Sequence, residues 1–132
     1  MSTILIVDDS SMVRRYVRQA LEALGFEVIE AGDGESALAQ VASKRPALVI
    51  SDVNMAPMNG FELLDNLRKR YTRQQLPILM LTTEADDAMK ARGKEAGANG
   101  WLVKPFDPAR MNAVVQHLLA ASARAAQEGQ AR

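Results

Sequence analysis

Five short, largely apolar segments recur along the chain, and they limit the possible folds more than any other feature. They are rich in β-branched residues and lie at residues 3–8, 26–31, 48–53, 77–82 and 100–104. Apolar runs of this kind, without strict alternation of polar and apolar residues, are typical of strands buried on both faces of a parallel sheet. The sequence therefore predicts five parallel strands.

The stretches between these segments carry the apolar spacing of amphipathic helices. The clearest helix start comes last, where Asp107 is a good N-cap and Pro108 occupies the first helical position. The predicted fourth helix, residues 85–97, is weak because Met89 is its only large apolar residue and Gly93 lies in its interior. We expect this helix to be either a moving part or a shallowly packed surface helix.

Five alternating strand and helix units predict an α/β fold with a doubly wound, five-stranded parallel sheet and helices on both faces. We assign residues 1–122 to one domain. Residues 123–132 are predicted to form a frayed C-terminal tail, because large apolar residues are absent from them.

Composition argues against several function classes. The formal net charge is zero, which gives little support to nucleic-acid binding, and the absence of cysteine removes disulfides, thiolate metal sites and cysteine nucleophiles. No apolar stretch approaches the roughly 20 residues of a membrane span, and no basic region precedes the first apolar run as in a signal peptide. We expect a cytoplasmic protein that binds neither nucleic acid nor membrane.

Polar residues stand at the carboxyl ends of four of the predicted strands. Asp8 and Asp9 end the first strand, Asp52 the third, Thr82 the fourth and Lys104 the fifth. The carboxyl ends of parallel strands share one edge of the sheet, where open α/β folds place their ligands. Each residue alone is common in a turn or a helix cap, but four strands with complementary chemistry at one edge predict one functional pocket.

Three carboxylates in one pocket repel one another, and one lysine does not neutralise them. A hard divalent cation with oxygen ligands would do so, and we expect Mg²⁺, with Mn²⁺ as an acceptable substitute. We assign Asp9 and Asp52 as direct ligands and Asp8 as a ligand through water. The backbone carbonyl of Asn54 is a further candidate ligand.

A metal and a lysine beside one carboxylate also describe a phosphoryl acceptor. Asp52 could attack phosphorus in line and form an acyl phosphate. Lys104 would then neutralise the phosphoryl oxygens, and the Thr82 hydroxyl would hydrogen-bond to one of them. Because an acyl phosphate hydrolyses, such a site would limit the lifetime of its own signal.

Four ordered segments resemble the receiver family of bacterial two-component response regulators. They are ILIVDDS with the acidic pair, LVISDVNM with the acceptor, PILMLTTEA with the threonine and GWLVKPF with the lysine. The resemblance covers residues 3 to about 120 and is closest to single-domain, chemotaxis-type (CheY-like) members. It implies the flavodoxin-like strand order 2-1-3-4-5, with the site between strands one and three, and a cis bond before Pro105.

In this family two further side chains influence hydrolysis of the acyl phosphate, and their positions fall on Asn54 and Glu84. Both residue types resemble those of fast-cycling members, so the resemblance implies short-lived phosphorylation. It describes a switch with self-catalysed phosphorylation and dephosphorylation, not a multiple-turnover enzyme. The other roles carry over to the metal pair Asp8 and Asp9, the phosphoacceptor Asp52, the switch threonine Thr82 and the phosphate clamp Lys104.

Three positions depart from the family pattern. Trp101 stands where an aromatic switch is commonly tyrosine or phenylalanine, so we expect either altered switching or simple packing over the fourth helix. Pro57 lies one place later than usual in the loop beside the site. Asp86 and Asp87 replace positions where motor-binding chemotaxis proteins often carry lysines, which argues against a flagellar motor partner.

The resemblance implies a histidine kinase or a histidine phosphotransfer protein as phosphodonor. The output would be protein–protein contact through a face formed by the fourth helix, the strand that contains Trp101 and the last helix. Two outputs stay open: the flagellar motor switch of chemotaxis, or another protein target.

Two other classes of protein were considered for this pattern of residues. A haloacid-dehalogenase-like phosphatase also uses an aspartate nucleophile, Mg²⁺ and a lysine, but it has Asp-x-Asp after its first strand, where this chain has Asp8, Asp9 and Ser10. A flavodoxin-like FMN protein would have a phosphate loop rich in Ser, Thr and Gly at that position. Two carboxylates there would repel a phosphate unless a metal intervened.

Overall fold

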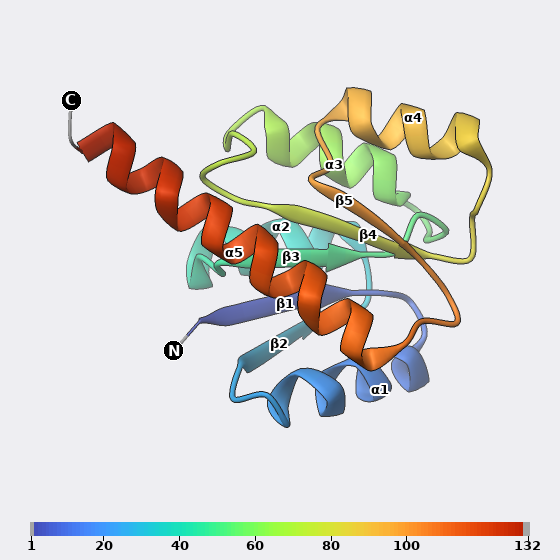
Figure 1. Cartoon of the computed structure of the whole chain (residues 1–132). Helices are drawn as coiled ribbons and strands as arrows, with labels where there is room; N and C mark the ends of the chain where they lie inside the picture. The colour runs from blue at the N-terminus through green and yellow to red at the C-terminus, as the bar shows by residue number, and fades with distance from the viewer. Residues whose placement is uncertain (1, 131–132) are drawn as a thin grey trace.

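The computed structural model of the protein describes residues 2–130 and contains a five-stranded parallel sheet in the order β2-β1-β3-β4-β5. This is the flavodoxin-like order that the family resemblance implied, and the α/β class is confirmed. Strands and helices alternate along the chain (Figure 1) as β1 Thr3–Val7, α1 Ser11–Glu22, β2 Glu27–Ala31, α2 Gly34–Lys44, β3 Leu48–Ser51, α3 Gly60–Arg68, β4 Ile78–Thr82, α4 Asp87–Ala96, β5 Gly100–Val103 and α5 Pro108–Gln130.

Two apolar layers cover the two faces of the sheet, because neighbouring side chains of a strand point in opposite directions. In β1, Leu5 and Val7 pack with α2, α3 and α4, whereas Ile4 and Ile6 pack with α1 and α5. All four side chains are buried. The central strands are therefore covered on both sides, as their continuous apolar character predicted, and their polar chemistry is confined to their ends.

Side chains at the helix starts fix where several helices begin. Ser10 caps α1 by accepting a hydrogen bond from the Val13 N–H at 3.2 Å, and Asn59 caps α3 in a reciprocal pair with Glu62. The predicted cap of α5 is confirmed, since the Asp107 carboxylate accepts from the Ala109 N–H at 3.0 Å. These caps set the first turns of α1 and α3 beside the carboxyl ends of the strands that precede them.

Helix α4 is shallowly packed, in agreement with one of the two interpretations of its sequence; its mobility stays a prediction. Of its residues only Gly93 is buried. Asp86 caps the helix by accepting from the Ala88 N–H at 2.7 Å, and Asp87 lies in the first turn, where a negative charge favours a helix. Capping thus supplies a structural reason for the acidic pair that replaces the expected lysines.

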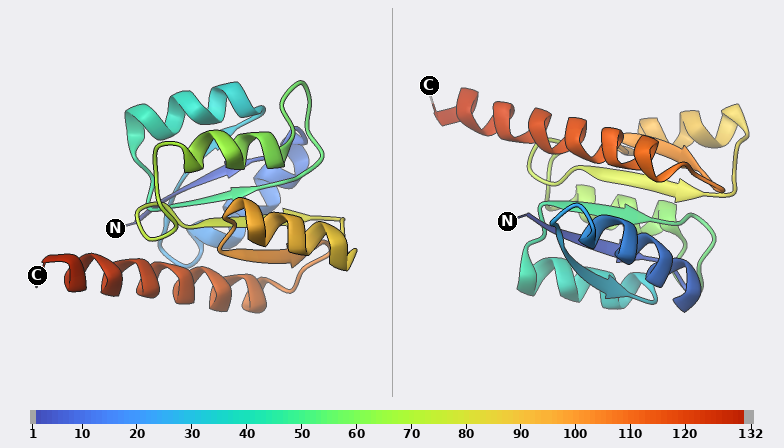
Figure 2. Two further views of the ribbon diagram at one scale, coloured as in Figure 1. Left: turned by 90° about the horizontal axis from the view of Figure 1, so that it is seen from above. Right: turned by 60° about the horizontal axis from the view of Figure 1, so that its bottom comes forward.

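Helix α5 continues to Gln130 and extends past the sheet (Figure 2). The helical conformation therefore includes most of the predicted tail, 123–132, whose last two residues lie outside the described part. Fraying of this segment and the domain boundary at 122 stay predictions. Within residues 2–130 no helix combines the length and the apolar character needed to cross a membrane.

Candidate functional site

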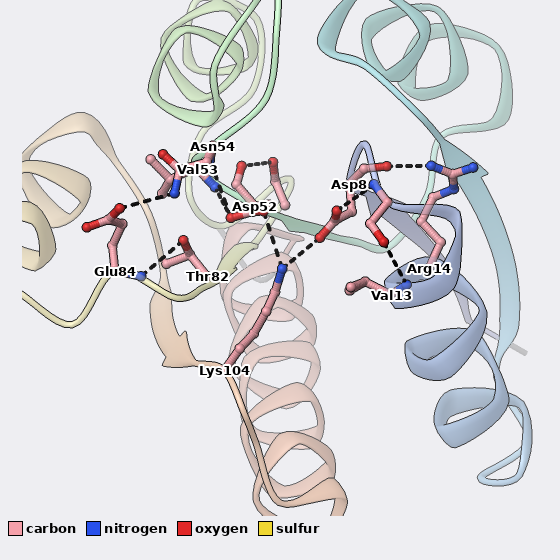
Figure 3. Close-up of polar contacts among 11 residues, drawn as sticks. Asp8, Val13, Arg14, Asp52, Val53, Asn54, Thr82, Glu84 and Lys104 are labelled. Atoms are coloured by element: carbon pink, nitrogen blue, oxygen red, sulfur yellow. Dashed lines mark hydrogen bonds and ion pairs between the residues drawn. The ribbon is translucent and has the colours of Figure 1, made fainter.

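The predicted polar residues meet at the carboxyl edge of the sheet, around the point where strand order reverses between β1 and β3 (Figure 3). Asp8 and Asp9 follow β1, Asp52 follows β3, Thr82 is the last residue of β4, and Lys104 follows β5. Residues 8 and 104 are 96 positions apart, yet their side chains are in direct contact. The parallel topology alone brings these strand ends together.

Three carboxylates form what we call the acidic cluster, made of Asp8, Asp9 and Asp52. One carboxylate oxygen from each residue lies within 4.8 Å of the others. Asp8 is 3% exposed and Asp52 is 8% exposed, whereas Asp9 is exposed to solvent. Like charges this close repel one another, and most strongly where they are buried, so the cluster favours a nearby cation.

Lys104 supplies one of those cations. Its Nζ lies 2.8 Å from Asp8 Oδ2 and 3.3 Å from Asp52 Oδ2, so it contacts Asp8 more closely than the expected acceptor. Burial alone would lower the pKa of Lys104, but its hydrogen bond to Asp8 and the charge of Asp52 outweigh burial and raise it. By formal charge, three carboxylates and one ammonium leave two negative charges in excess. Oxygen donors with this excess charge fit a hard divalent cation such as Mg²⁺.

Backbone contacts hold the Asp52 carboxylate in place. Its Oδ1 accepts hydrogen bonds from the Val53 N–H at 2.7 Å and the Asn54 N–H at 3.4 Å, which leaves Oδ2 toward Lys104. Gly60 makes this loop possible, because a Cβ atom there would lie 2.2 Å from the Asp52 backbone oxygen. Sequence reasoning did not predict this close approach, because it depends on how the loop after Asp52 folds back on the start of α3.

Arg14 supports the first strand end, and sequence reasoning missed it as well. Its guanidinium donates to the Asp8 backbone carbonyl at 2.5 Å and pairs with Glu30 at 2.9 Å, while the Asp8 side chain accepts from the Ser10 N–H at 2.9 Å. An arginine one turn into α1 gives no local signal of this role. The contact becomes visible only when β2, which carries Glu30, is paired with β1.

A set of hydrogen bonds links the loop after Asp52 to Trp101. The Asn54 amide donates to Glu84 Oε1 at 3.1 Å, and the Glu84 backbone N–H donates to the buried Thr82 hydroxyl at 3.3 Å. The Trp101 indole N–H donates to the Glu84 backbone carbonyl at 2.8 Å. Glu84 therefore contacts all three of the other residues, each of which was singled out from the sequence.

Trp101 packs against α4, where Gly93 leaves space for its ring. Its ring stacks on Phe61 with centroids 6.2 Å apart, and a Cβ atom at Gly93 would lie 2.7 Å from the indole. Gly93 weakens the helix in isolation but leaves room for the bulky ring. The predicted packing of Trp101 against the fourth helix is thus present in the structure, while a switching role for Trp101 stays a prediction.

The loops beside the site contain two cis peptide bonds. Lys104–Pro105 is cis, which confirms the implication of the family resemblance, and Ala56–Pro57 is cis as well. The proline that lies one place later than usual in the sequence, Pro57, is therefore the residue that follows this second cis bond.

The chain matches the family described as the response regulator receiver domain over residues 4–116. It belongs to this family. Among solved structures it is similar to the chemotaxis response regulator CheY4 of Vibrio cholerae, with a TM-score of 0.83 and 44% identity over 89% of this chain and 98% of that one.

Curated relatives include longer proteins. The chain is 40% identical over 116 residues to the probable transcriptional regulator ycf27 of Cyanophora paradoxa, which covers 88% of this chain and 47% of that protein. It is 37% identical over 116 residues to the alkaline phosphatase synthesis transcriptional regulatory protein PhoP of Bacillus subtilis, over 88% of this chain and 48% of that one. The chain spans about half the length of these relatives.

Membership of the receiver domain family establishes the general function of the chain. Receiver domains of two-component response regulators are phosphorylation-dependent switches rather than multiple-turnover enzymes, and this chain is one of them. They bind Mg²⁺ through an acidic pocket, and they interact with histidine kinases and downstream effectors. This assignment replaces the phosphatase and flavin-protein alternatives.

Proposed function

We propose that this receiver accepts a phosphoryl group on Asp52 from a histidine kinase or a histidine phosphotransfer protein. The observation that carries the proposal is the position of the Asp52 carboxylate within the acidic cluster, with one oxygen held by backbone N–H groups and the other facing Lys104. A carboxylate fixed in this way is an oriented nucleophile beside a positive charge.

The surrounding side chains support in-line phosphoryl transfer. Attack by an Asp52 oxygen forms an O–P bond as the P–N bond to the donor imidazole breaks, and Lys104 neutralises the phosphoryl oxygens. The Thr82 hydroxyl accepts from the Glu84 N–H, so its own proton stays available for a phosphoryl oxygen.

The proposed ligands of Mg²⁺ are the Asp9 and Asp52 carboxylates and the Asn54 backbone carbonyl. Asp8 would act through water, because Lys104 and the Ser10 N–H already engage its two oxygens. When bound, Mg²⁺, or Mn²⁺ in its place, would supply positive charge that stabilises the phosphoryl oxygens. It would also offset the two negative charges that remain in excess in the acidic cluster.

We further propose that Asn54 and Glu84 influence the loss of the phosphoryl group. Their side chains are hydrogen-bonded at 3.1 Å and follow β3 and β4, whose ends border the acidic cluster. A water molecule approaching phosphorus along this side would meet both polar groups. Short-lived phosphorylation is the expected consequence.

The signal would leave through a protein partner on the α4-β5-α5 face, in the cytoplasm. Glu84 is hydrogen-bonded to both Thr82 and Trp101. A movement of Thr82 toward a phosphoryl group would therefore change the position of Glu84 and, through it, of the Trp101 indole in β5. Similarity to a chemotaxis response regulator supports chemotaxis or flagellar motor signalling, and similarity to transcriptional regulators supports other outputs. The motor switch and another protein target are both candidate partners.

Intact-mass analysis after incubation with a small phosphodonor and Mg²⁺ tests the proposal. We expect one phosphoryl adduct on the wild-type chain, no adduct on Asp52→Asn, and no adduct when a chelator removes the cation. The same sample followed over time should lose its adduct well within hours. A persistent adduct on Asp52→Asn would show that another residue is the acceptor.

A further inference from the structure

A groove on the α4 side of the molecule carries positive charge, and among the described residues no carboxylate forms an ion pair with it. It is lined by the α3–β4 loop, α4, the α4–β5 loop and β5, and its volume is about 390 Å³. We call it the basic groove; its lining includes Arg73, Lys90, Lys94, Ala98, Gly100 and Trp101.

Three cations of the basic groove are exposed: Arg73, Lys90 and Lys94. Arg73 donates to the Lys94 backbone carbonyl at 2.6 Å, which fixes the α3–β4 loop against the end of α4 and keeps these cations together. Asp87 and Glu95 are the acidic residues of α4, but among the described residues neither they nor any other carboxylate forms an ion pair with the groove.

A fourth cation, Arg68, adjoins the groove through Asn99, which is also part of the lining. The Arg68 guanidinium donates to the Gly97 and Leu76 backbone carbonyls at 2.9 Å and to the Asn99 side chain at 2.8 Å, so its contacts are neutral acceptors. Burial and, to a smaller extent, the charge of Arg73 lower the pKa of Arg68 to about 10, so it is still charged at neutral pH. Positive charges therefore gather here in a chain whose net charge is zero.

Like charges held together without a counter-charge favour an acidic ligand. The floor of the groove is apolar, since Ala98 and Gly100 adjoin the half-buried Trp101. We propose that the basic groove binds an acidic segment of a protein partner, with one apolar side chain seated against Trp101. The inference rests on the proposed α4-β5-α5 output face and specifies the chemistry of its partner.

A nucleic acid or a lipid surface fits these observations less well. Binding to a phosphate backbone uses a basic stripe with many contacts and is favoured by positive net charge. The basic groove has three exposed cations around a space for one or two side chains, and the rest of the chain balances their charge. An acidic protein segment matches both the size and the charge.

Selection from a random peptide library on the immobilised, full chain tests the proposal. Enriched peptides should be acidic with an apolar residue, and their binding should change the fluorescence of Trp101, the only tryptophan. The change should weaken as salt is raised. Enrichment of neutral or basic peptides, or no enrichment, would overturn the inference.

A pair of charge-reversed variants locates the binding. Lys90→Glu with Lys94→Glu should weaken an enriched peptide about tenfold. The matched control, Arg15→Glu with Lys44→Glu, changes the charge equally at exposed positions outside the groove and should leave affinity within about twofold. Equal losses in both variants, or a neutral Lys90→Gln, Lys94→Gln variant that binds as tightly as wild type, would contradict a groove site.

Two further arms separate the alternatives. Labelled duplex DNA and vesicles containing phosphatidylserine should not bind; binding of either one that Lys90→Glu with Lys94→Glu abolishes would replace the protein partner by that ligand. Phosphorylation of each variant is measured in parallel by intact mass. Acidic peptide binding without any adduct on the wild type would refute the proposed phosphoacceptor and leave the groove inference standing, and the reverse result would refute only the groove.

Discussion

The acidic cluster and the basic groove both collect like charges, but they differ in burial. In the acidic cluster Asp8 and Asp52 are almost fully buried, and Lys104 contacts both. In the basic groove Lys90 and Lys94 are exposed and contact no carboxylate among the described residues. Water and salt screen the groove, whereas the cluster has little water to screen it.

This difference predicts what each region binds. Repulsion between poorly hydrated carboxylates is strong, and a small ion with several oxygen ligands relieves it at a fixed geometry. Repulsion between hydrated lysines is weak, so the groove can stay unpaired until a larger acidic surface meets it. The first region suits chemistry, and the second suits a reversible contact that depends on salt.

The same substitution in the two regions should give the largest contrast. In the absence of divalent cations, Lys104→Met should lower the free energy of unfolding by about 3 kcal/mol, because it leaves two buried carboxylates without their ammonium. Lys94→Met should change it by less than about 0.5 kcal/mol, because the Lys94 side chain is exposed and forms no ion pair with any described residue. Urea unfolding at neutral pH measures both values.

Mg²⁺ provides the control for this pair. It should stabilise Lys104→Met at least as much as wild type, since the variant keeps all three carboxylates and lacks a competing cation. Equal destabilisation by Lys104→Met and Lys94→Met would mean that burial does not separate the two regions as we argue.

Each region also depends on a glycine, and the two should differ in what they tolerate. Gly60→Ala places a Cβ 2.2 Å from the Asp52 backbone oxygen, so the loop must move, and we expect a loss of about 2 kcal/mol. Gly93→Ala meets the Trp101 ring at 2.7 Å but gains about 1 kcal/mol of helix propensity, so the net loss should be about 1 kcal/mol or less.

Thermal unfolding and the Trp101 emission spectrum check this second contrast. Gly93→Ala should shift the emission, because the indole must move. Gly60→Ala should reduce phosphorylation of Asp52 and leave the emission close to that of the wild type. A Gly60→Ala protein as stable as wild type would show that the loop after Asp52 yields more easily than its contacts indicate.

The strand ends and the two glycines also differ in how well their roles could be predicted from the sequence. Apolar strands that end in Asp8, Asp52 and Lys104 predicted both the fold and the meeting of these side chains, because parallel topology places all strand ends at one edge. The strand order itself came from the family resemblance. Local patterns were sufficient wherever the position of a residue within its own strand determined its place.

Contacts between distant elements were beyond such patterns. The role of Gly93 depends on the Trp101 ring of β5, and the basic groove depends on Arg73 reaching α4 from the α3–β4 loop. From the sequence we considered only the charges at the acidic start of α4, at Asp86 and Asp87, and took them as evidence against a flagellar motor partner. The later part of the same helix restores positive charge with Lys90 and Lys94.

A third group of charges, between α1 and β2, gives the intermediate case, because its signs are paired and it is partly exposed. Glu30 contacts Arg14 at 2.9 Å and Arg18 at 2.6 Å. Burial alone would raise the pKa of Glu30, but the hydrogen bonds from Arg18 and Arg14 outweigh burial and hold it below its usual value. A lowered folded-state pKa stabilises the protein above the unfolded-state pKa, and this contribution is lost as the pH falls through the folded-state value.

Glu30→Gln should therefore be less stable than wild type by up to about 1 kcal/mol at neutral pH, an effect smaller than that at Lys104 because the group is partly hydrated. Urea unfolding at a series of pH values should show the difference shrinking below about pH 4, as Glu30 becomes protonated in both states of the wild type. A difference that persists unchanged in acid would assign the loss to packing rather than charge. In that case, pairing of opposite charges would contribute little in this molecule unless the group is buried as deeply as Asp8.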